Sequence, residues 1–401
     1  MYVKKVKILN FRNIKNMELN LNKNVNIFIG KNAQGKTSIL ESIYVLALTK
    51  SMKNMPDNNL INKDSDFSRL SCTLEVEKKL SNLEIILENS KKTLKVNGNV
   101  ENKVFNYVSL MNVIMFSPDD LDIVKKSPNY RRNLLNIELC QLFPNYTRVL
   151  NEYNKLLKMR NEYLKKDSFD EIYFDILTDR LIDRAIVIMK YRDDFIRNIN
   201  LNIGDIFNKI MKCEGLNIVY EKSIDSVKKE EIKRIYKDSF EQEKLKKLTL
   251  YGPHRDDFSF YLYDEDLKLY GSQGQQRVSV LSFKLAEIKL FKEVKKTYPL
   301  VLLDDIFSEL DIEKRKNFLK FIKSNIQFII TTTDVNNISA KVLDKASVFK
   351  IKDGKLMSGS VLKWMSKNMI HLLFKFLRDL RLFVRDLECI LVQLMLRGCI
   401  I

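Results

Sequence analysis

The stretch that most constrains this chain covers residues 30–38 and reads Gly-Lys-Asn-Ala-Gln-Gly-Lys-Thr-Ser. It fits the pattern G-x-x-x-x-G-K-S/T, in which the backbone of a glycine-rich loop surrounds the phosphates of a nucleotide. Gly30 and Gly35 allow the sharp turn that directs successive N–H groups toward phosphate oxygens. Lys36 is expected to reach the β- and γ-phosphates, and the Thr37 hydroxyl is a natural Mg²⁺ ligand.

The residues on both sides of this loop support the match. Residues 25–29 have the pattern of a buried strand, and residues 39–48 have the composition of a helix. A helix that begins at the loop adds the positive end of its dipole to the anion site. A chance Gly/Lys turn is therefore the weaker explanation. The residues expected to bind the nucleotide are Gly30, Lys31, Asn32, Ala33, Gln34, Gly35, Lys36, Thr37 and Ser38.

Composition limits the class of protein. A chain of 401 residues is long enough for two or three subdomains. Its net charge of +18 favours a polyanionic partner, most simply nucleic acid, although a proteome rich in Lys and Asn gives the same excess. The five cysteines are scattered and form no C-x-x-C pair, which argues against a disulfide framework or a zinc site and fits a reducing cytoplasm. The first residues contain no long apolar segment, so no signal peptide is expected.

Alternating apolar and polar residues predict β-structure in the first part of the chain. Residues 2–29 are expected to form two or three strands that lead into the loop. The alternation returns over residues 70–96, and Asn97-Gly98 is a strong hairpin pattern. We therefore expect an antiparallel sheet at the edge of the nucleotide-binding fold.

Two residues of this region have open alternatives. Arg12 lies between the first two strands, where a contact with the nucleotide and an ordinary surface position are equally supported. Residues 113–116 form a short apolar run typical of a buried strand, and Ser117 follows it. Ser117 is expected to cap a helix with proline in its first turn, to help sense the nucleotide, or both.

From residue 121 to residue 211 the apolar period changes from 2 to 3.6. This change predicts two long antiparallel helices of about 20–30 residues each, joined near Asp167-Ser168. The apolar stripes are expected to form the core of this helix pair. Their members are Tyr146, Leu150, Tyr153, Leu157 and Leu164, and then Ile172, Leu177, Leu181, Ala185 and Ile188.

Charged segments surround this helical arm. A basic cluster at its start could contact phosphate or form an ordinary solvated face, and both explanations stay open. Residues 222–247 predict a charged surface helix. Residues 248–251 predict a strand that runs into a turn at residues 252–257, which is expected to be structural and could face DNA or the nucleotide. The basic cluster consists of Lys125, Lys126, Arg131 and Arg132.

A second polar turn precedes an apolar helix later in the chain. Residues 271–277 read Gly-Ser-Gln-Gly-Gln-Gln-Arg, and a Ser-x-Gly-Gln turn at a helix N-terminus can bind an anion. The simpler explanation is a polar loop that caps the helix. The turn is too far from Lys36 in the sequence to belong to the same loop, so it needs a different role.

Acidic residues follow the next apolar strand. Residues 299–303 are apolar throughout, as expected for a strand buried on both faces of a parallel sheet, and Asp304 and Asp305 end it. Adjacent carboxylates at a strand end are costly unless a cation or a reaction uses them. Asp304 suits Mg²⁺, and Asp305 suits a general base that polarises the attacking water. Residues 327–330 predict a further strand, which ends at threonines whose hydroxyls could sense the γ-phosphate.

Together these features resemble ABC-type ATPases in which a helical arm is inserted, as in the SMC-like group, and more closely the RecF family of bacterial recombinational repair proteins. The resemblance covers residues 1–357 and implies an α/β fold, a P-loop ABC-type ATPase head with an inserted antiparallel helical arm. The implied divisions are 1–116 and 248–357 for the two halves of the head and 117–247 for the arm. The residues that carry the resemblance are 10–13, 30–37, 116–118, 252–257, 272–276 and 303–311.

The resemblance implies a mechanism with ATP and Mg²⁺. ABC-type heads dimerise head to tail around two ATP molecules, so the second turn would contact the γ-phosphate bound to Lys36 of the other subunit. Asp305 stands where many ABC ATPases have Glu, and Thr332 lies near the usual switch histidine, which implies slow, weak DNA-dependent ATP hydrolysis. Thr37 and Asp304 would hold the metal, and Arg12 would contact the nucleotide. The second turn contributes Ser272, Gln273, Gly274 and Gln275.

The resemblance also implies partners. Such proteins act as ATP-driven clamps on double-stranded DNA near single-stranded gaps, and they help RecO and RecR to load RecA in repair and SOS induction. The alternative is an SMC-like chromosome-organising ATPase. A cytoplasmic protein without a membrane partner is expected. The tail 358–401 departs from the family pattern, and its apolar runs are too short to span a bilayer.

Overall fold

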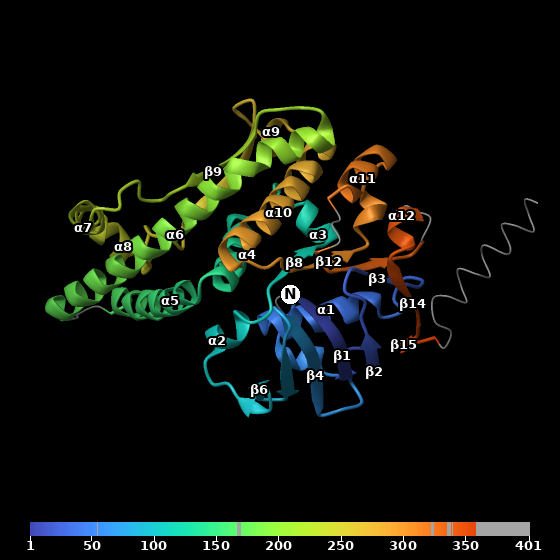
Figure 1. Cartoon of the computed structure of the whole chain (residues 1–401). Helices are drawn as coiled ribbons and strands as arrows, with labels where there is room; N and C mark the ends of the chain where they lie inside the picture. Colours follow the sequence, from blue (N-terminus) through green and yellow to red (C-terminus); the bar gives the residue numbers. More distant parts are fainter. Residues whose placement is uncertain (54, 167–169, 322–324, 335–337, 339, 358–401) are drawn as a thin grey trace, which may run out of the picture.

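The computed structural model describes the chain except for residues 54, 167–169, 322–324, 335–337, 339 and 358–401. The predicted connection at 167–168 and the atypical tail therefore lie outside the described residues. Figure 1 shows two sheets that enclose a central helix, and a long helical arm that projects from one side of them.

The larger core is built on a sheet whose main strands are parallel. Its order is β15-β14-β3-β13-β12-β8, with only the β14–β15 pair antiparallel. The inner strands are buried on both faces, which confirms the predictions from their continuous apolar runs. The strands are β3 (Val25–Ile29), β8 (Val113–Phe116), β12 (Leu300–Asp304), β13 (Phe328–Thr332), β14 (Ala346–Lys352) and β15 (Lys355–Leu356).

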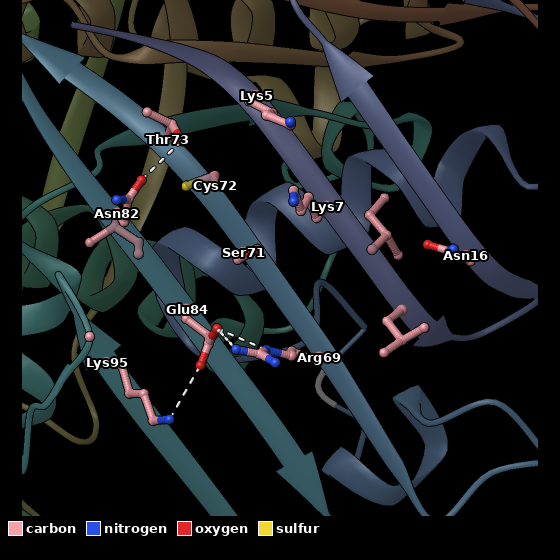
Figure 2. A pocket seen from close by; sticks show the side chains of 14 residues that line it. Lys5, Lys7, Asn16, Arg69, Ser71, Cys72, Thr73, Asn82, Glu84 and Lys95 are labelled. Atoms are coloured by element: carbon pink, nitrogen blue, oxygen red, sulfur yellow. Dashed lines mark hydrogen bonds and ion pairs between the residues drawn. The ribbon is translucent and has the colours of Figure 1, made fainter.

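The second sheet is antiparallel, as the alternating pattern predicted, in the order β2-β1-β4-β5-β6-β7. Asn97 and Gly98 have φ values of 51° and 87° between β6 and β7, which confirms the hairpin. The outer face carries polar side chains that pair across strands, as Figure 2 shows for Arg69 and Lys95 on either side of Glu84. The strands are β1 (Tyr2–Phe11), β2 (Ile14–Asn20), β4 (Phe67–Val76), β5 (Lys79–Glu88), β6 (Lys91–Val96) and β7 (Asn99–Val100).

Helix α1 (Lys36–Leu48) lies between the two sheets (Figure 1). It packs on β1 and β4 of the antiparallel sheet and on β12 and β13 of the parallel sheet. Because both sides of the helix face a sheet, almost all of its residues are buried and it has no polar stripe. Residues of β12 alternate between two cores: Leu300 and Leu302 face α1, and Val301 and Leu303 face the arm side.

The arm is formed mainly by α5 (Pro144–Leu164) and α6 (Glu171–Met211), which pack along each other. The predicted helix pair is therefore confirmed, but α6 has 41 residues and a length of about 60 Å, longer than expected. Its second half packs on α10 (Gln273–Lys295) of the head. Ile172 was predicted to be buried and is 76% exposed, because Phe174 occupies the inward position on the first turn of α6.

The predicted charged surface helix at residues 222–247 is confirmed in character but consists of two helices, α7 (Lys229–Asp238) and α8 (Phe240–Lys246), and α7 buries Ile232 and Tyr236. One further expectation for this region is wrong. Residues 248–251 do not form a strand, because side chains satisfy their backbone: Asn161 accepts from Thr249 N and Glu243 accepts from Leu250 N, both at 2.8 Å. The ladder begins at β10 (Asp257–Leu262), which pairs with β9 (Leu216–Glu221) and β11 (Glu265–Asp266).

Short helices complete the described part. A 15-residue helix, α4 (Pro128–Leu142), starts the arm, and the sequence analysis did not separate it from the helix that follows Pro144. No described helix combines the length and the apolar character needed to cross a membrane. The remaining elements are η1 (Asp57–Leu60), α2 (Val104–Val108), α3 (Pro118–Leu121), α9 (Leu267–Tyr270), η2 (Ile306–Glu309), α11 (Ile312–Leu319) and α12 (Ala340–Leu343).

Candidate nucleotide-binding site

The glycine-rich loop connects the end of β3 to the start of α1, as the sequence predicted. Gly35 precedes α1 with φ of 99°, in the left-handed region that favours glycine. A Cβ at Gly30 would lie 2.5 Å from the carbonyl oxygen of Ile351, so a side chain there would displace backbone. Both glycines of the pattern are thus required by the loop's conformation.

Lys36 lies on the first turn of α1 and folds back across the loop. Its Nζ donates to the carbonyl oxygens of Gly30 and Lys31 at 2.7 and 2.8 Å. Burial lowers the pKa of Lys36, and the charges of Asp305 and Asp304 oppose this shift. The ammonium group is therefore fixed on the loop itself, where it can bind phosphate oxygens together with the backbone N–H groups.

Hydroxyl groups and a carboxylate converge beside Lys36. Thr37 Oγ1 donates to Asp304 Oδ1 at 3.0 Å, and Thr331 Oγ1 donates to the same oxygen at 2.6 Å. These groups come from the start of α1 and from the ends of β12 and β13. Hydroxyl and carboxylate oxygens are the ligands that Mg²⁺ prefers, so the donor set fits this ion.

Asp305 follows Asp304 with φ of 49°, a left-handed conformation that is uncommon for a residue other than glycine. Its backbone N–H donates to Thr331 Oγ1 at 3.0 Å. Its buried Oδ1 has no hydrogen-bond partner among the described residues. Burial raises the pKa of Asp305, while Lys36 opposes the shift and Asp304 adds to it. A carboxylate with a free oxygen and a raised pKa can accept a proton from water.

These groups border a cavity of about 870 Å³, within the range of small-molecule and cofactor sites. The cavity contains both parts of the predicted site, the glycine-rich loop and the pair of carboxylates, although 267 positions separate Thr37 from Asp304. Its lining residues are Arg12, Asn13, Asn32, Ala33, Gly35, Lys36, Thr37, Ser38, Asn59, Ile61, Asn62, Lys63, Asp64, Pro118, Asp304 and Asp305.

Arg12 reaches this cavity but is held by a buried carboxylate. Its Nε and Nη2 donate to the two carboxylate oxygens of Glu41 at 3.0 and 3.1 Å, and Nη1 donates to Asn59 O at 3.1 Å. Only 23% of the Arg12 side chain is exposed, so it is not an ordinary surface arginine. Glu41 was not predicted as a site residue, although its position inside the otherwise apolar helix α1 was the available clue.

The predicted helix cap at Ser117 is confirmed. Ser117 Oγ accepts from Asp120 N at 3.2 Å, and the Asp120 carboxylate accepts from Ser117 N at 3.0 Å, which closes a capping box at α3. Of the predicted threonines, Thr331 donates to the Asp304 carboxylate and accepts from the Asp305 N–H. Thr332 instead closes a local turn with Asp334, at 2.8 Å from its carbonyl oxygen.

The Ser-x-Gly-Gln turn caps α10. Ser272 Oγ accepts from Gln275 N at 3.2 Å, and Gln275 Oε1 accepts from Ser272 N at 2.8 Å. Ser272 and Gln273 are exposed, and no residue of 272–275 lines the cavity beside Lys36 in the described part of the chain. In Figure 1 the start of α10 lies beside α9, away from α1. Within one chain, the structure does not bring this turn to the glycine-rich loop.

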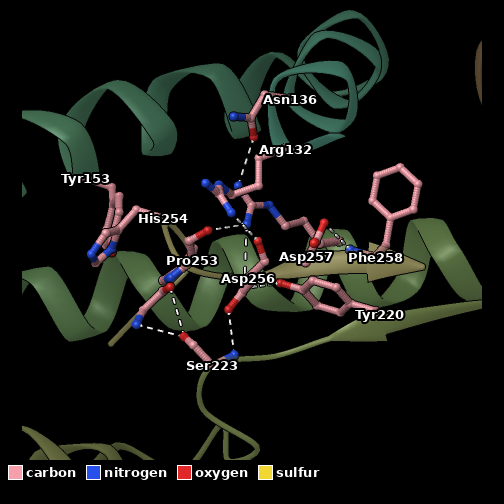
Figure 3. Close-up of polar contacts among 12 residues, drawn as sticks. Arg132, Asn136, Tyr153, Tyr220, Ser223, Pro253, His254, Asp256, Asp257 and Phe258 are labelled. Atoms are coloured by element: carbon pink, nitrogen blue, oxygen red, sulfur yellow. Dashed lines mark hydrogen bonds and ion pairs between the residues drawn. The ribbon is translucent and has the colours of Figure 1, made fainter. Parts of the chain in front are cut away.

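The turn at residues 252–257 is structural (Figure 3). His254 Nδ1 lies 2.7 Å from Tyr153 Oη, and its Nε2 lies 3.1 Å from Thr249 O. The Asp256 carboxylate accepts from Tyr220 Oη and from Ser223 N. The turn therefore joins the arm to the β9–β10 pair, and it does not line the cavity beside Lys36.

Arg131 in the basic cluster follows neither of its two expected roles. It is 3% exposed, and its Nε and Nη2 donate to the Asp257 carboxylate at 2.7 and 2.6 Å. Its Nη1 also donates to the carbonyl oxygens of Ile123, Val124 and Lys126. Both predictions for Arg131, a solvated face and a phosphate contact, are wrong, because all three guanidinium nitrogens donate to groups inside the protein.

Comparison with known proteins supports the same fold. The model of the RecF/RecN/SMC N-terminal domain matches residues 2–356. A protein of Clostridium beijerinckii named DNA replication and repair protein RecF is 39% identical over 365 residues, which cover 89% of this chain and 99% of that relative. A protein of the same name from Halalkalibacterium halodurans is 38% identical over 367 residues, with the same coverage.

Solved structures give the same grouping. A structure described as the recombination mediator protein RecF-ATP in the RecFOR pathway matches with a TM-score of 0.82 and 28% identity, over 90% of this chain and 97% of that one. An Smc head bound to the C-terminal winged-helix domain of ScpA matches with a TM-score of 0.53 and 15% identity, over 91% of this chain and 100% of that one, which shows the ABC ATPase fold alone. The α/β head with an inserted helical arm is thus the fold of this group, and the chain belongs to the RecF family of DNA replication and repair proteins.

Proposed function

We propose that this chain is an ATP-dependent DNA-binding protein of recombinational repair, whose ATPase site is completed by a second copy. The observation that carries the proposal is the convergence of Lys36, Thr37, Asp304 and Asp305 on one cavity. Groups of this kind bind the phosphates, the metal and the attacking water in P-loop ATPases. A relative that was solved with ATP supports the choice of nucleotide.

In this proposal each side chain has one role. The backbone N–H groups of residues 30–38 and the ammonium group of Lys36 bind the β- and γ-phosphates. Thr37 and Asp304 would hold Mg²⁺, which neutralises charge on the transferred phosphate when it is bound. Asp305 orients the attacking water and accepts its proton through the unpartnered Oδ1. Arg12, fixed by Glu41, contacts the nucleotide at the edge of the cavity.

The second copy supplies the Ser-x-Gly-Gln turn. Ser272, Gln273, Gly274 and Gln275 of one protomer contact the γ-phosphate that is bound to Lys36 of its partner. The exposure of Ser272 and Gln273, and the absence of all four residues from the cavity lining of their own chain, support an arrangement in trans. Asp305 is one methylene shorter than a Glu at this position, so we expect slow hydrolysis that DNA stimulates weakly.

The ATP-bound dimer closes on double-stranded DNA beside single-stranded gaps and acts with RecO and RecR to load RecA during repair and SOS induction. The net charge of +18 supports a DNA partner, and the RecFOR pathway in the description of a solved relative supports these protein partners. Residues 1–116 and 248–357 form the head, and residues 117–247 form the arm. Because bacterial ATP and chromosomal DNA are both in the cytoplasm, we expect the protein to act there.

The alternative is an SMC-like ATPase that organises chromosomes. Such a protein needs a long coiled coil with a hinge, whereas the longest described helix of this arm has 41 residues, a length of about 60 Å. Light scattering after gel filtration tests the main proposal, with ATP and a duplex oligonucleotide added separately and together. We expect a dimer only with ATP and a DNA complex only from the dimer. A chain that stays monomeric and ignores DNA in the presence of ATP would contradict it.

A further inference from the structure

A second cavity, of about 530 Å³, lies at the base of the arm. It is bordered by α4, by α5, by α6 through Arg192 and by the turn at residues 252–257, and no residue lines both this cavity and the one beside Lys36. It therefore needs its own explanation. Its lining residues are Ser127, Asn129, Tyr130, Arg132, Asn133, Asn136, Leu150, Tyr153, Asn154, Arg192, Pro253 and His254.

The lining has an unusual composition. It contains two arginines, one histidine and four asparagines, and none of these described lining residues is acidic. Four of them lie on α4 with the spacing of a single helix face, which the sequence analysis did not recognise. They are Asn129, Arg132, Asn133 and Asn136. Polar donors on one face of a helix form a surface suited to an anion, although the buried carboxylate of Asp256 lies nearby and pairs with Arg192 at 3.5 Å.

Arg192 is almost fully buried and fixes one of these amides. Its three nitrogens donate to Tyr146 Oη at 3.2 Å, to Pro253 O at 2.6 Å and to Asn136 Oδ1 at 3.0 Å. Asn136 Oδ1 also accepts from Tyr146 Oη at 2.6 Å. Because the amide oxygen receives two donors, the Nδ2 group of Asn136 remains as a donor to a ligand.

Arg132 supplies the charge (Figure 3). Its Nη1 donates to the carbonyl oxygen of Asp256 at 2.8 Å, and within the described chain no carboxylate lies at ion-pair distance from its guanidinium. Burial lowers the pKa of Arg132; Asp257 and Asp256 oppose the shift, and Arg192 and Arg255 add to it. A bound anion would stabilise the charge of this partly buried guanidinium, whose remaining Nε and Nη2 groups are suited to phosphate oxygens.

We infer that this cavity binds a phosphate of a nucleic acid strand, with the amides of α4 around it. The inference rests on the proposed function, because the family and the charge of the chain favour DNA among anionic ligands. The volume is large enough for one nucleotide unit. Arg132 neutralises the single charge of the phosphodiester, and Asn133 and Asn136 donate to its oxygens or to the adjoining base. The 252–257 turn holds Arg132 at the site through the carbonyl oxygen of Asp256, and it borders the cavity with Pro253 and His254.

The test compares two variants with the same change in charge. Asn133→Asp places a carboxylate in the cavity, whereas Asn151→Asp places one on the exposed surface of α5, outside the lining. Binding of a fluorescent duplex and of a thymidine oligonucleotide is measured by anisotropy with ATP at several salt concentrations. We expect Asn133→Asp to weaken binding about tenfold or more relative to Asn151→Asp. The slope of log affinity against log salt concentration should fall by about one for each phosphate that the protein no longer neutralises.

The outcomes separate this inference from the proposed function. Wild-type protein that fails to dimerise or to bind DNA with ATP contradicts the proposed function, whatever the variants do. Wild-type protein that binds DNA, with both variants equal in affinity and slope, overturns only this inference. The phosphate could come from a DNA strand or from a free nucleotide. Binding of thymidine monophosphate to the Lys36→Ala variant separates the two, because this variant should not bind a nucleotide at the glycine-rich loop. A loss of thymidine monophosphate binding in Asn133→Asp with unchanged DNA affinity would assign the cavity to a free nucleotide.

Discussion

Thr37 Oγ1 lies 3.0 Å from Asp304 Oδ1, and this contact joins the start of α1 to the end of β12 across 267 positions of the sequence. Both elements are buried in the same core, so the packing of α1 between the sheets determines the distance. The ligand groups for a metal are thus arranged by the fold itself. Groups fixed in advance need little reorganisation when they bind a ligand, which favours both binding and catalysis.

Lys36→Ala should abolish ATP binding. The variant removes the charge that faces the phosphates, and charge-assisted hydrogen bonds of this kind contribute about 10- to 100-fold each to affinity. The matched control is Lys31→Ala, an exposed neighbour in the same loop whose expected role uses its backbone only. Anisotropy of a fluorescent ATP analogue measures both. Equal losses of ATP affinity in the two variants would mean that only the total positive charge of the loop matters and that Lys36 has no specific role.

Asp305→Asn should keep ATP binding and lose hydrolysis. The amide has nearly the same shape but cannot accept the proton of the attacking water, and loss of a general base lowers rates by about 10²–10⁴-fold. Single-turnover release of phosphate, measured beside ATP affinity, separates the two steps. A variant that hydrolyses ATP at the wild-type rate would remove Asp305 from the mechanism.

Ser272→Ala should keep ATP binding and lose ATP-driven dimerisation. The change also removes the N-cap of α10, at a cost of about 1 kcal/mol. Asp170→Ala controls for this cost, because Asp170 caps α6 through Tyr173 N at the far end of the arm. Light scattering with ATP should give a dimer for the control only. If Ser272→Ala instead lost ATP binding, the turn would belong to the site of its own chain.

Local patterns were enough to predict most of the head. The strands β3, β8, β12 and β13 are continuous apolar runs because the sheet is covered on both faces, and the loop before α1 is a contiguous motif. The proximity of Asp304 and Thr37 could be predicted only from the family resemblance, because no local pattern links residues so distant in the sequence. The exposed turn at Ser272 was predicted as a possible cap of the helix that follows it, and the structure confirms this cap at α10.

The errors of the sequence analysis have a common physical cause. Residues 248–251 look like a strand, yet the side chains of Asn161 and Glu243 satisfy their backbone and replace a ladder. Arg131 looks like a surface cation, yet Asp257 neutralises it in the interior. In each case a partner distant in the sequence decided the structure, and no window of the sequence contains that information. Two signals were readable and overlooked, the spacing of the asparagines on α4 and the position of Glu41 in an otherwise apolar helix.

A buried charge cluster allows a stability prediction. Lys284 Nζ lies 3.1 Å from both Glu138 Oε1 and Glu287 Oε2, and all three side chains are at most 3% exposed. Burial raises the pKa of Glu287 well above its usual value, with the charge of Glu138 as the next cause, so Glu287 is expected to hold a proton. Lys284→Met leaves the carboxylate of Glu138 unpaired and should lower the free energy of unfolding by about 3–5 kcal/mol.

Glu287→Gln is the matched variant and should cost much less, because it replaces a group that is already neutral. The folded chain keeps a proton that the unfolded chain releases near pH 4.5, so the wild-type protein loses stability as the pH rises above that value toward the raised pKa. The glutamine variant should lack this loss. Urea denaturation at pH 6 and pH 8 measures the difference, and a steeper pH dependence in Glu287→Gln would contradict the assignment of the proton.

The titration of His254 should make the stability of the protein depend on pH in the opposite direction. Burial lowers its pKa to about 4, with the charge of Arg255 also lowering it and the hydrogen bond to Thr249 O opposing. Because Thr249 O can only accept, Nε2 carries the proton, and Nδ1 accepts from Tyr153 Oη. The unfolded chain gains a proton near pH 6.5, whereas the folded chain gains one only near pH 4. Stability should therefore fall by about 3 kcal/mol as the pH drops through this window. His254→Gln should be less stable at pH 7.5 but should lose this slope in urea denaturation, and a slope that persists would assign the pH dependence to other groups.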